Sequence, residues 1–570
     1  MIFEKDVPIR ASDGNVLRAN VFRPSGQGPH PVVMAHGSYG KDVHFSHAFK
    51  PQWDKLNRLY PGLCDEGSSG RYLRWETVDP ERWVPDGYAV VQVDSRGTGK
   101  SPGYLDPFSP REIQDYYDCI EWAGTQAWSN GKVGLLGVSY YGIEQWQVAA
   151  LRPPHLAAIC VWEGYADRYR DSTHHGGILC TFVKNWQDMQ VKNVQHGVGQ
   201  RGPVSKVTGE LVCGPDTLDE SVLAQRRVPM WADLSRNHLD GSYYKERTPV
   251  LEDIEVPLLS CGNWGGHGLH NRGNVEGFVR AGSKHKWLEM HGGAHWAGYY
   301  TDYGVELQKR FFDHYLKGAQ NGWDSKQPKV QLQIRHVDRF VLRHEHEWPI
   351  ARTQWTPMHL DVHGMRMGDQ PPAQQGKVSY LPLVAGLTFH SEPMAQDTEI
   401  TGPMALKLFI SSASKDADVF AVFRVFDPQG VEVVFQGALD PHTPIAQGWL
   451  RASHRKLDPK LTLPYRPYHT HDEDQPLKPG EVYELDVEIW PTCIVIPSGY
   501  QVAISIRGRD YEWDGPAATL SNMKNPMKGC GPFVHDDEQD RPATIFDTQV
   551  SLHFGPGCPS RLLLPVIGPA

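Results

Sequence analysis

The chain has 570 residues, 40% of them hydrophobic and 22% charged, and its formal net charge is −10. This length predicts about three or four folding units, and an excess of acidic groups without a basic run argues against binding to nucleic acid or to an anionic membrane. The N-terminus has no signal-peptide pattern and the nine cysteines form no C-x-x-C motif, so we expect a cytoplasmic protein with free thiols.

The first third of the chain alternates predicted strands and helices. A hairpin is predicted over residues 7–23, around the turn at Asp13-Gly14. Ser109-Pro110-Arg111-Glu112 forms the start signal of a helix, and a second helix is predicted over 140–151. This alternation predicts a mostly parallel sheet with helices on both faces. The remaining predicted strands are 31–35, 88–93, 133–138, 156–162, 256–260 and 286–290.

Two long segments interrupt this alternation. Residues from about 165 to 248 lie between two predicted strands and are expected to form a largely helical cap over the carboxyl edge of the sheet. A second segment, 41–83, is expected to line the same opening. After about residue 327 the apolar residues alternate with period two between Pro/Gly turns, which predicts an antiparallel β-sandwich of about 240 residues.

Ser139 is the candidate nucleophile. It stands in Gly137-Val138-Ser139-Tyr140-Tyr141-Gly142, between a predicted buried strand and a helix. A serine on such a tight turn is presented at the edge of the sheet, and small glycines let the strand and the helix approach closely. The pattern departs from G-x-S-x-G because Tyr141 takes the place of the second glycine. The backbone N–H of Tyr140 is expected to begin the helix and to donate to an oxyanion.

The elbow and several other motifs resemble the CocE/NonD hydrolases, a family related to the X-Pro dipeptidyl peptidases. The residues that carry the resemblance are 94–103, 127–132, 137–146, 448–455 and 477–481. The resemblance implies an α/β-hydrolase core, a helical cap and a C-terminal jelly-roll β-sandwich that together act on esters or amides. We therefore predict a core of residues 1–164 and 249–326, a cap of 165–248 inserted in it, and a jelly roll of 327–570.

The catalytic base is expected to be a histidine in the loop after the last core strand. His291 and His295 both lie there. The resemblance aligns His295 with the histidine that closes the family's Gly-Pro-Trp-Ser-His stretch, which implies that His295 is the base. His291 stands at the end of the strand and is expected to be a structural hydrogen-bonding residue.

The acid of the triad departs from the family pattern. The resemblance implies an Asp after the preceding strand, but Gly266 takes its place, and residues 256–275 contain no carboxylate. Glu163 follows the strand after the nucleophile helix, from which it can reach the same histidine, and an ionised group at a buried strand end needs a partner. Glu276 is the alternative acid. A purely structural role for Glu163 is also open, as the ion-pair partner of Arg168 or Arg170.

Tyr39 is the candidate second oxyanion donor. Its segment, Ser38-Tyr39-Gly40-Lys41, resembles the family's Pro-Tyr-Asp-Lys stretch, in which the tyrosine hydroxyl donates into the oxyanion hole. One such donor is worth roughly 3 kcal/mol of the barrier. Tyr39 could instead pack at the rim of the pocket, and a backbone N–H of His36-Gly37 could supply the donor.

No metal or other cofactor is expected. His267 and His270 lack a Cys or carboxylate at a metal-site spacing, and we expect these two histidines to line the opening of the pocket. Tryptophans could form an apolar substrate pocket or belong to the core, and the sequence leaves both open. The tryptophans concerned are Trp162, Trp231, Trp264 and Trp296.

The sequence therefore predicts a serine hydrolase that cleaves small-molecule esters through an acyl-enzyme, with Ser139, His295 and Glu163 as its triad. The alternative is an amide or peptide hydrolase, and a dipeptidyl peptidase would need cap carboxylates to bind the free amine of its substrate. A remote alternative is a carbohydrate-binding protein with a decayed hydrolase core. The jelly roll also offers surface for a homodimer. The cap acids considered for amine binding are Asp216, Asp219, Glu220 and Asp233.

Overall fold

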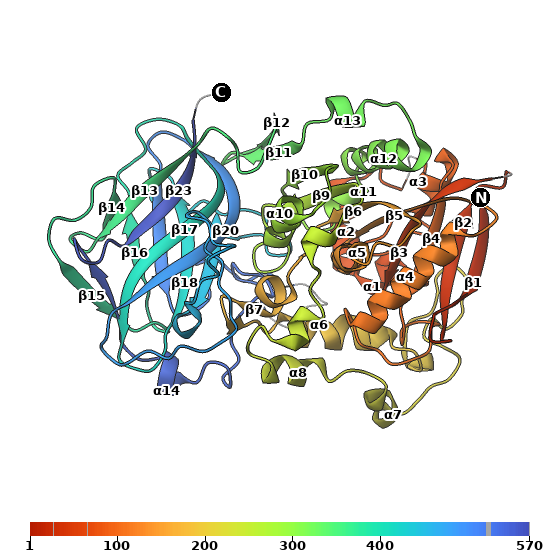
Figure 1. Cartoon of the computed structure of the whole chain (residues 1–570), viewed down its shortest axis with the longest axis horizontal. Helices are drawn as coiled ribbons and strands as arrows, with labels where there is room; N and C mark the ends of the chain where they lie inside the picture. Colours follow the sequence, from red (N-terminus) through yellow and green to blue (C-terminus); the bar gives the residue numbers. More distant parts are fainter. Residues whose placement is uncertain (27, 65–66, 520–525, 569–570) are drawn as a thin grey trace.

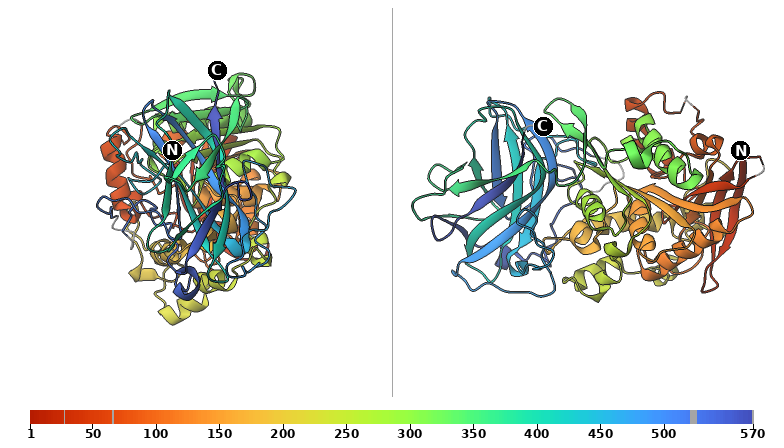
Figure 2. Two further views of the ribbon diagram at one scale, coloured as in Figure 1. Left: turned by 90° about the vertical axis from the view of Figure 1, so that its left-hand side faces the viewer. Right: turned by 45° about the horizontal axis from the view of Figure 1, so that its top comes forward.

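The computed structural model describes residues 1–26, 28–64, 67–519 and 526–568, which fold into two bodies built on separate sheets (Figure 1). A ten-stranded sheet with its helices contains the N-terminal part of the chain, and an eleven-stranded sheet contains the C-terminal part. The same two bodies stand side by side in the tilted view of Figure 2. Within the described residues, no helix combines the length and the apolar character needed to cross a bilayer.

The first sheet is mostly parallel, as the sequence predicts. Its strands follow the order β1-β2-β4-β3-β5-β6-β9-β10-β11-β12. The run from β4 to β11 is parallel, while β1 and β2 form an antiparallel hairpin at one end and β12 is antiparallel at the other. The strands are β1 (Ile2–Arg10), β2 (Val16–Arg23), β3 (His30–Gly37), β4 (Ala89–Asp94), β5 (Ser129–Val138), β6 (Leu156–Trp162), β9 (Leu258–Asn263), β10 (Lys286–His291), β11 (Val330–Arg335) and β12 (Phe340–Glu345).

Helices cover both faces of this sheet. In β5, Leu135 belongs to a core with residues of α4 and α5, whereas its neighbour Leu136 belongs to a core with residues of α12. Successive strand residues point to opposite faces, so the two cores lie on either side of the sheet. Helix α4 begins after Ser109, whose hydroxyl accepts from the N–H of Glu112 at 3.3 Å, as its start signal predicts. The larger helices are α2 (Lys50–Leu59), α4 (Pro110–Gly124), α5 (Tyr140–Ala149), α10 (Asn271–Arg280) and α12 (Asp302–Lys317).

Residues 165–248 contain short helices separated by turns. The segment also holds a two-stranded hairpin, β7 (His174–His175) with β8 (Ile178–Leu179), which contacts the C-terminal body at β19 (Ala446–Arg451). The expectation of a helical cap over the sheet remains a prediction, although several residues of this segment line the pocket described below. Its α-helices are α6 (Phe182–Trp186), α7 (Glu220–Gln225), α8 (Met230–Arg236) and α9 (Ser242–Lys245).

The predicted boundary between residues 326 and 327 precedes the end of the first sheet. Strand β11 pairs with β10 and β12 pairs with β11, so the first sheet continues to Glu345, and the second sheet begins only at β13. The period-two pattern that marked the boundary is shared by the outermost strands of the first sheet, which explains the difference. The remaining short helices of the first body are α1 (Phe45–Ala48), α3 (Pro80–Trp83), α11 (Ala297–Tyr300) and α13 (Trp323–Lys326).

The C-terminal strands close on themselves around their own core. Strand β23 pairs with both β13 and β17, so the eleven-stranded sheet curls into a barrel or sandwich with an aliphatic interior. A short helix, α14 (Ala543–Phe546), lies outside it. The strands are β13 (Thr353–Asp361), β14 (Arg366–Gly368), β15 (Gly376–Tyr380), β16 (Leu387–His390), β17 (Thr398–Ser412), β18 (Asp418–Phe426), β19 (Ala446–Arg451), β20 (Tyr483–Ile496), β21 (Gln501–Arg507), β22 (Val550–Phe554) and β23 (Arg561–Ile567).

A buried arginine joins the two bodies. Arg272 of α10 is 2% exposed, and its guanidinium contacts Asp171 at 2.8 Å and Glu488 of β20 at 2.9 Å. Breaking a buried ion pair from one side leaves the other charge buried without compensation, which is more costly than losing the attraction itself. Arg272 holds two such carboxylates, one from each body, so it is a strong determinant of how the bodies pack.

We predict that Arg272→Met lowers the free energy of unfolding by about 3–5 kcal/mol, because Asp171 and Glu488 lose their cation. Urea denaturation followed by tryptophan fluorescence measures the change. The matched control is Arg280→Met on the same helix, whose partner Glu252 is half exposed and for which we expect less than about 1 kcal/mol. Equal losses in the two variants would contradict the prediction.

Candidate active site

Ser139 occupies a strained turn between β5 and α5. Its backbone has φ 55° and ψ −113°, a combination that non-glycine residues rarely adopt. The conformation is held by a hydrogen bond from the Ser139 N–H to the Trp162 carbonyl at 3.0 Å, while two helix N–H groups donate to the Ser139 carbonyl. The turn therefore presents the hydroxyl at the carboxyl end of the parallel strands, where α/β sheets bind their ligands.

The glycines around this turn are required by close packing. A Cβ on Gly137 would lie 2.3 Å from the Cβ of Tyr141, and a Cβ on Gly142 would lie 3.0 Å from the Trp162 carbonyl oxygen. The side chain of Tyr141 thus fills the space above Gly137, and the second glycine of the elbow is displaced by one position to Gly142. The departure from G-x-S-x-G keeps the tight approach of strand and helix.

Glu163 lies beside His295, at the end of β6. One of its carboxylate oxygens contacts Nδ1 of His295 at 2.7 Å. The other accepts from Nε2 of His291 at 3.0 Å and from the side-chain amide of Asn263 at 3.2 Å. Glu163 has no exposed surface and its φ is 45°, so its backbone is strained as well. A purely structural role for Glu163 would have paired it with Arg168 or Arg170. Arg168 instead contacts Tyr165, and Arg170 contacts Asp167.

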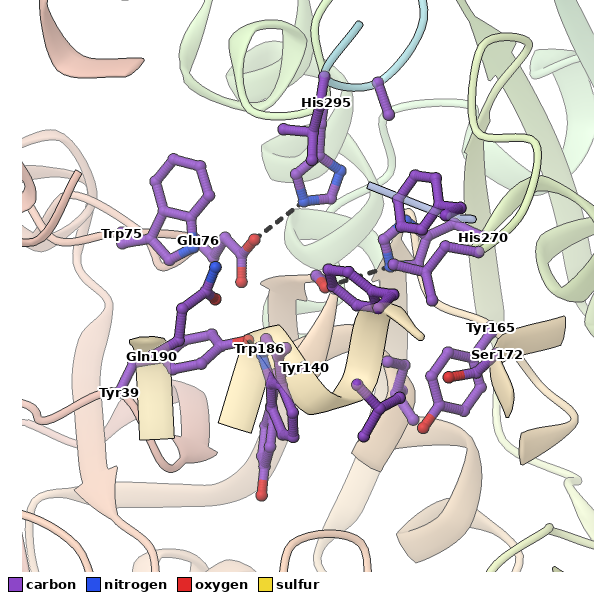
Figure 3. A pocket seen from close by; sticks show the side chains of 18 of the residues that line it. Tyr39, Trp75, Glu76, Tyr140, Tyr165, Ser172, Trp186, Gln190, His270 and His295 are labelled. Atoms are coloured by element: carbon purple, nitrogen blue, oxygen red, sulfur yellow. Dashed lines mark hydrogen bonds and ion pairs between the residues drawn. The ribbon is translucent and has the colours of Figure 1, made fainter. Parts of the chain in front are cut away.

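His295 also contacts a second carboxylate, one that no sequence motif marks. Its Nε2 lies 2.9 Å from an oxygen of Glu76 (Figure 3). Glu76 belongs to the loop before α3, and its backbone carbonyl accepts from the N–H of Val138, next to Ser139. His295 is therefore held between two buried carboxylates, and no hydrogen bond joins it to Ser139 in the described part of the chain.

The hydroxyl of Ser139 instead contacts His270. The distance from Oγ to Nε2 of His270 is 3.1 Å, and the imidazole ring stacks on that of His295 with centroids 5.0 Å apart and planes within 5°. The other nitrogen of His270, Nδ1, is buried and has no hydrogen-bond partner among the described residues. The two contacts expected of one catalytic histidine are thus divided between two: His295 contacts the carboxylate of Glu163, and His270 contacts the hydroxyl of Ser139.

The charges of these groups follow from burial and from their partners. Burial opposes ionisation of Glu163, but the charge of His295 and the hydrogen bonds of His291 and His295 lower its pKa to about 2. Burial likewise opposes protonation of His295, but the carboxylates of Glu163 and Glu76 raise its pKa above the ordinary value. Burial raises the pKa of Glu76 to about 7. Burial and the charge of His295 hold the pKa of His270 well below its ordinary value, so His270 is neutral beside Ser139.

The two residues predicted to supply oxyanion donors, Tyr39 and Tyr140, lie in the wall of one pocket. The aromatic rings of Tyr39 and Tyr140 have centroids 5.4 Å apart, and both residues line the same pocket as Ser139. The hydroxyl of Tyr39 accepts from the indole N–H of Trp186 at 2.8 Å, which leaves its own proton for another acceptor. The Tyr140 hydroxyl donates to Glu112, but its backbone N–H is the first of α5, where no intrahelical acceptor exists.

Other predicted residues lie elsewhere. Glu276 on α10 forms an ion pair with Arg466, and no contact joins it to His295 or His270 within the described ranges. His267 is buried and stacks on Trp490 rather than lining the pocket. The tryptophans left open by the sequence are core residues or pack against the core. None of the cap acids proposed for amine binding lines the pocket of Ser139.

The pocket of Ser139 is largely aromatic and draws on both bodies. Ala438, Leu439 and Phe533 of the C-terminal body complete one wall, and the N–H of His295 donates to the Ala438 carbonyl at 2.9 Å. Apolar surroundings of this kind strengthen the electrostatic interactions between the charged groups inside. Further aromatic residues of the wall are Phe49, Trp75, Phe108, Phe182 and Trp186.

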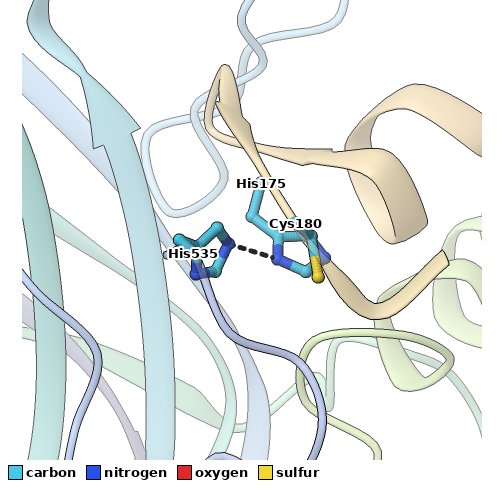
Figure 4. A group of neighbouring side chains, drawn as sticks. All are labelled: His175, Cys180 and His535. Carbon is cyan, nitrogen blue, oxygen red and sulfur yellow. Dashed lines mark hydrogen bonds between the residues drawn. The ribbon is translucent and has the colours of Figure 1, made fainter. Parts of the chain in front are cut away.

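Among the described residues, two groups of side chains bring possible metal ligands together. Glu163, His270 and His295 form the first, which is the site just described, and His175, Cys180 and His535 form the second (Figure 4). In the second group, Nδ1 of His175 lies 2.9 Å from Nε2 of His535, and the outer nitrogens face the Asp171 carbonyl and the Asp510 carboxylate.

Hydrogen bonding alone accounts for this second group. Its three contacts need three N–H protons on two rings, so one imidazole carries both protons. Burial and the charge of His535 lower the pKa of His175 to about 3, so the His175 ring is neutral. Burial raises the pKa of the Cys180 thiol, whereas a metal requires the thiolate. The group thus ties the β7–β8 hairpin to the C-terminal body through the hydrogen bond between His175 and His535.

Comparison with known proteins identifies the family. Residues 13–297 match X-Pro dipeptidyl-peptidase (S15 family), and residues 321–563 match the X-Pro dipeptidyl-peptidase C-terminal non-catalytic domain. A solved CocE/NonD family hydrolase from Staphylococcus aureus is 32% identical, with a TM-score of 0.84, over 100% of this chain and 94% of that one. This chain is a CocE/NonD hydrolase of the S15 family.

The relatives of this CocE/NonD hydrolase have both esterase and peptidase names. Cocaine esterase of Rhodococcus sp. is 23% identical over 98% of this chain and 97% of that protein. A putative Xaa-Pro dipeptidyl-peptidase of Streptomyces avermitilis is 21% identical over 79% of this chain and 71% of that protein. Membership in the family therefore establishes a hydrolase and leaves open which bond it cleaves.

Two residues of the site in this CocE/NonD hydrolase were not given a role from the sequence. Glu76 lies in the segment 41–83, which was expected to line the opening, but no local pattern separates it from nearby acids such as Glu81. His270 was expected at the opening, and the signal that could have raised its rank is its position just before α10, at the edge where β9 ends. The contacts of Glu76 with His295 and of His270 with Ser139 depend on loops far apart in the sequence.

Proposed function

We propose that this chain is a serine hydrolase that cleaves carboxylic esters through an acyl-enzyme. The observation that carries the proposal is Ser139 on a strained elbow, in an aromatic pocket that also holds His295 against the buried, ionised Glu163. Serine, imidazole and carboxylate in one pocket are the groups that this chemistry needs. The absence of the family's Asp after β9 is compensated by Glu163, which approaches the same imidazole from β6.

The reaction proceeds in two balanced steps. Ser139 Oγ bonds to the carbonyl carbon, its proton passes to His295 in the neutral form of the imidazole, and the alcohol leaves with that proton as the ester C–O bond breaks. Water then attacks the acyl-enzyme by the same route and releases the acid. Glu163 stabilises the imidazolium, while the Tyr140 N–H and the Tyr39 hydroxyl donate to the tetrahedral oxyanion. His270 holds the serine hydroxyl before attack, and Glu76 occupies Nε2 of His295 until substrate enters.

Ester cleavage is favoured over peptide cleavage by the charges of the pocket. A dipeptidyl peptidase has to bind the free ammonium of its substrate, and the cap acids Asp216, Asp219, Glu220 and Asp233 do not reach the pocket. Glu76 is a carboxylate there, but it already contacts His295. This leaves no second acid for an ammonium group among the described pocket residues.

We expect the chain to hydrolyse p-nitrophenyl acetate and butyrate but not Gly-Pro-p-nitroanilide, with Ser139→Ala lowering kcat by at least about 10⁴-fold. Release of p-nitrophenol and p-nitroaniline is followed by absorbance. Labelling by a fluorophosphonate probe, which should be lost in Ser139→Ala, checks that the serine is reactive. Cleavage of the anilide would support the peptidase instead, and ester turnover that survives in Ser139→Ala would refute the serine mechanism.

The contact between Ser139 and His270 supports a second assignment of the base, which mutation can test. With His295 as base, we expect His295→Asn to lower kcat/KM by about 10⁴-fold, and His270→Asn to lower it by about 10- to 100-fold through loss of serine positioning. Both variants are assayed on p-nitrophenyl butyrate, with circular dichroism as the folding control. A larger loss of kcat/KM in His270→Asn than in His295→Asn would identify His270 as the base.

We also predict that Glu76→Gln shifts the acidic limb of the kcat/KM profile to lower pH by about one unit. The carboxylate of Glu76 raises the pKa of His295, so its removal lowers that pKa and makes the neutral imidazole available at lower pH. The control is Glu289→Gln, which removes a buried carboxylate that contacts His291 but not His295. An unchanged limb in Glu76→Gln, or an equal shift in the control, would contradict the prediction.

A further inference from the structure

Arg168 is a buried cation in the wall of the Ser139 pocket. It follows β6 by six residues, begins the turn of residues 168–173, and is 2% exposed. Its guanidinium lies 4.8 Å from the ring centroid of Phe108, which is another residue of the pocket wall. Its position in the wall allows a molecule bound at Ser139 to reach it.

The guanidinium of Arg168 has unused hydrogen-bond donors. One Nη donates to the hydroxyl of Tyr165 at 2.8 Å and the other contacts the sulfur of Met230 at 3.7 Å. Nε is buried and has no acceptor among the described residues, and within them no carboxylate lies within 4.0 Å of the group. By contrast, the neighbouring Arg170 contacts Asp167 and Asp240.

A buried guanidinium without a carboxylate is costly unless an anion joins it. Burial opposes the charge of Arg168, but its interactions with Tyr165 and other tyrosines raise its pKa, so it remains a cation. A carboxylate is the small anion whose planar geometry matches the guanidinium, because it can accept two parallel N–H bonds.

The position of Arg168 also indicates which part of the substrate, the acyl group or the alcohol, it can bind. Tyr165, which binds Arg168, lies with Ser172 on the side of the pocket away from Trp75 and Glu76 (Figure 3). In the proposed mechanism the leaving alcohol takes its proton from His295, which contacts Glu76, so the alcohol occupies that side. The acyl part then extends in the opposite direction, toward Tyr165 and Arg168.

We propose that the pocket accepts esters whose acyl part ends in a carboxylate, that is, monoesters of short dicarboxylic acids, and that Arg168 binds this distal carboxylate. The inference rests on the proposed ester hydrolysis at Ser139 and adds the substrate class. The product of such a reaction is the free dicarboxylate, which occupies the same two positions.

The test compares monoethyl succinate with ethyl levulinate, which has the same chain length but a neutral methyl ketone in place of the distal carboxylate. Hydrolysis is followed in a pH-stat, which titrates the carboxylic acid released as each ester bond is cleaved. We expect kcat/KM for monoethyl succinate to exceed that for ethyl levulinate by at least about 10-fold. Arg168→Met should lower the value for monoethyl succinate by about 10²-fold, mainly through KM, and change that for ethyl levulinate less than about 3-fold.

The matched control is Lys184→Met, which removes one positive charge from α6 in the same segment without touching the pocket wall. Lys184→Met should change kcat/KM for both esters less than about 3-fold. This control separates general electrostatic steering of an anionic substrate from binding at Arg168. Equal losses on both esters in Arg168→Met, or no preference for the anionic ester in the wild type, would overturn the inference.

A measurement on the wild type covers the case in which Arg168→Met does not fold. Succinate should inhibit hydrolysis of p-nitrophenyl butyrate competitively, at least about 10-fold more strongly than butyrate, because only succinate carries the distal carboxylate. Equal inhibition by the two acids would overturn the inference. If the wild type hydrolyses neutral esters but not monoethyl succinate, the substrate class alone is refuted. If it hydrolyses none of the esters, the proposed function is refuted.

Discussion

The geometry of the site depends on one buried carboxylate, that of Glu163. It receives hydrogen bonds from His291, His295 and Asn263, which come from the ends of β9 and β10 and the loop that follows. An ionised group in an apolar interior is stable only when its lone pairs are satisfied by donors of opposite charge or polarity. The loops after three neighbouring strands are consequently drawn to one point, and the position of His295 relative to Ser139 follows from it.

We propose that Glu163, placed by the same constraint, takes the role of the Asp that the family resemblance implies after β9. Adjacent parallel strands end at the same edge of a sheet, so a carboxylate on β6 and one on β9 can approach a histidine after β10 from either side. Here β9 supplies Asn263 instead, a neutral donor to Glu163. In the proposed assignment the acid comes from β6, one strand away from the expected position, and Asn263 at the end of β9 is its hydrogen-bond partner.

Much of this arrangement could be predicted from the sequence because it depends on local patterns. The alternation of strands and helices indicates the parallel sheet, and the Gly-rich turn around Ser139 marks the elbow. Residues whose role depends on distant loops could not be assigned: Glu76 approaches His295 across more than two hundred residues, and His270 reaches Ser139 from the start of α10. The boundary predicted at residue 327 depends on a local pattern too, and β11 and β12, which have the period-two pattern of a sandwich strand, pair with the first sheet.

The contribution of the C-terminal body to the pocket has a consequence for synthesis on the ribosome. The first sheet is complete once Glu345 has emerged, but the wall containing Ala438 and Phe533 is translated much later. At about 5–20 residues per second, that interval is on the order of tens of seconds. During it the aromatic lining beside Ser139 faces solvent, so the nascent chain passes through a stage in which an apolar surface is open to chaperones or to other unfinished chains.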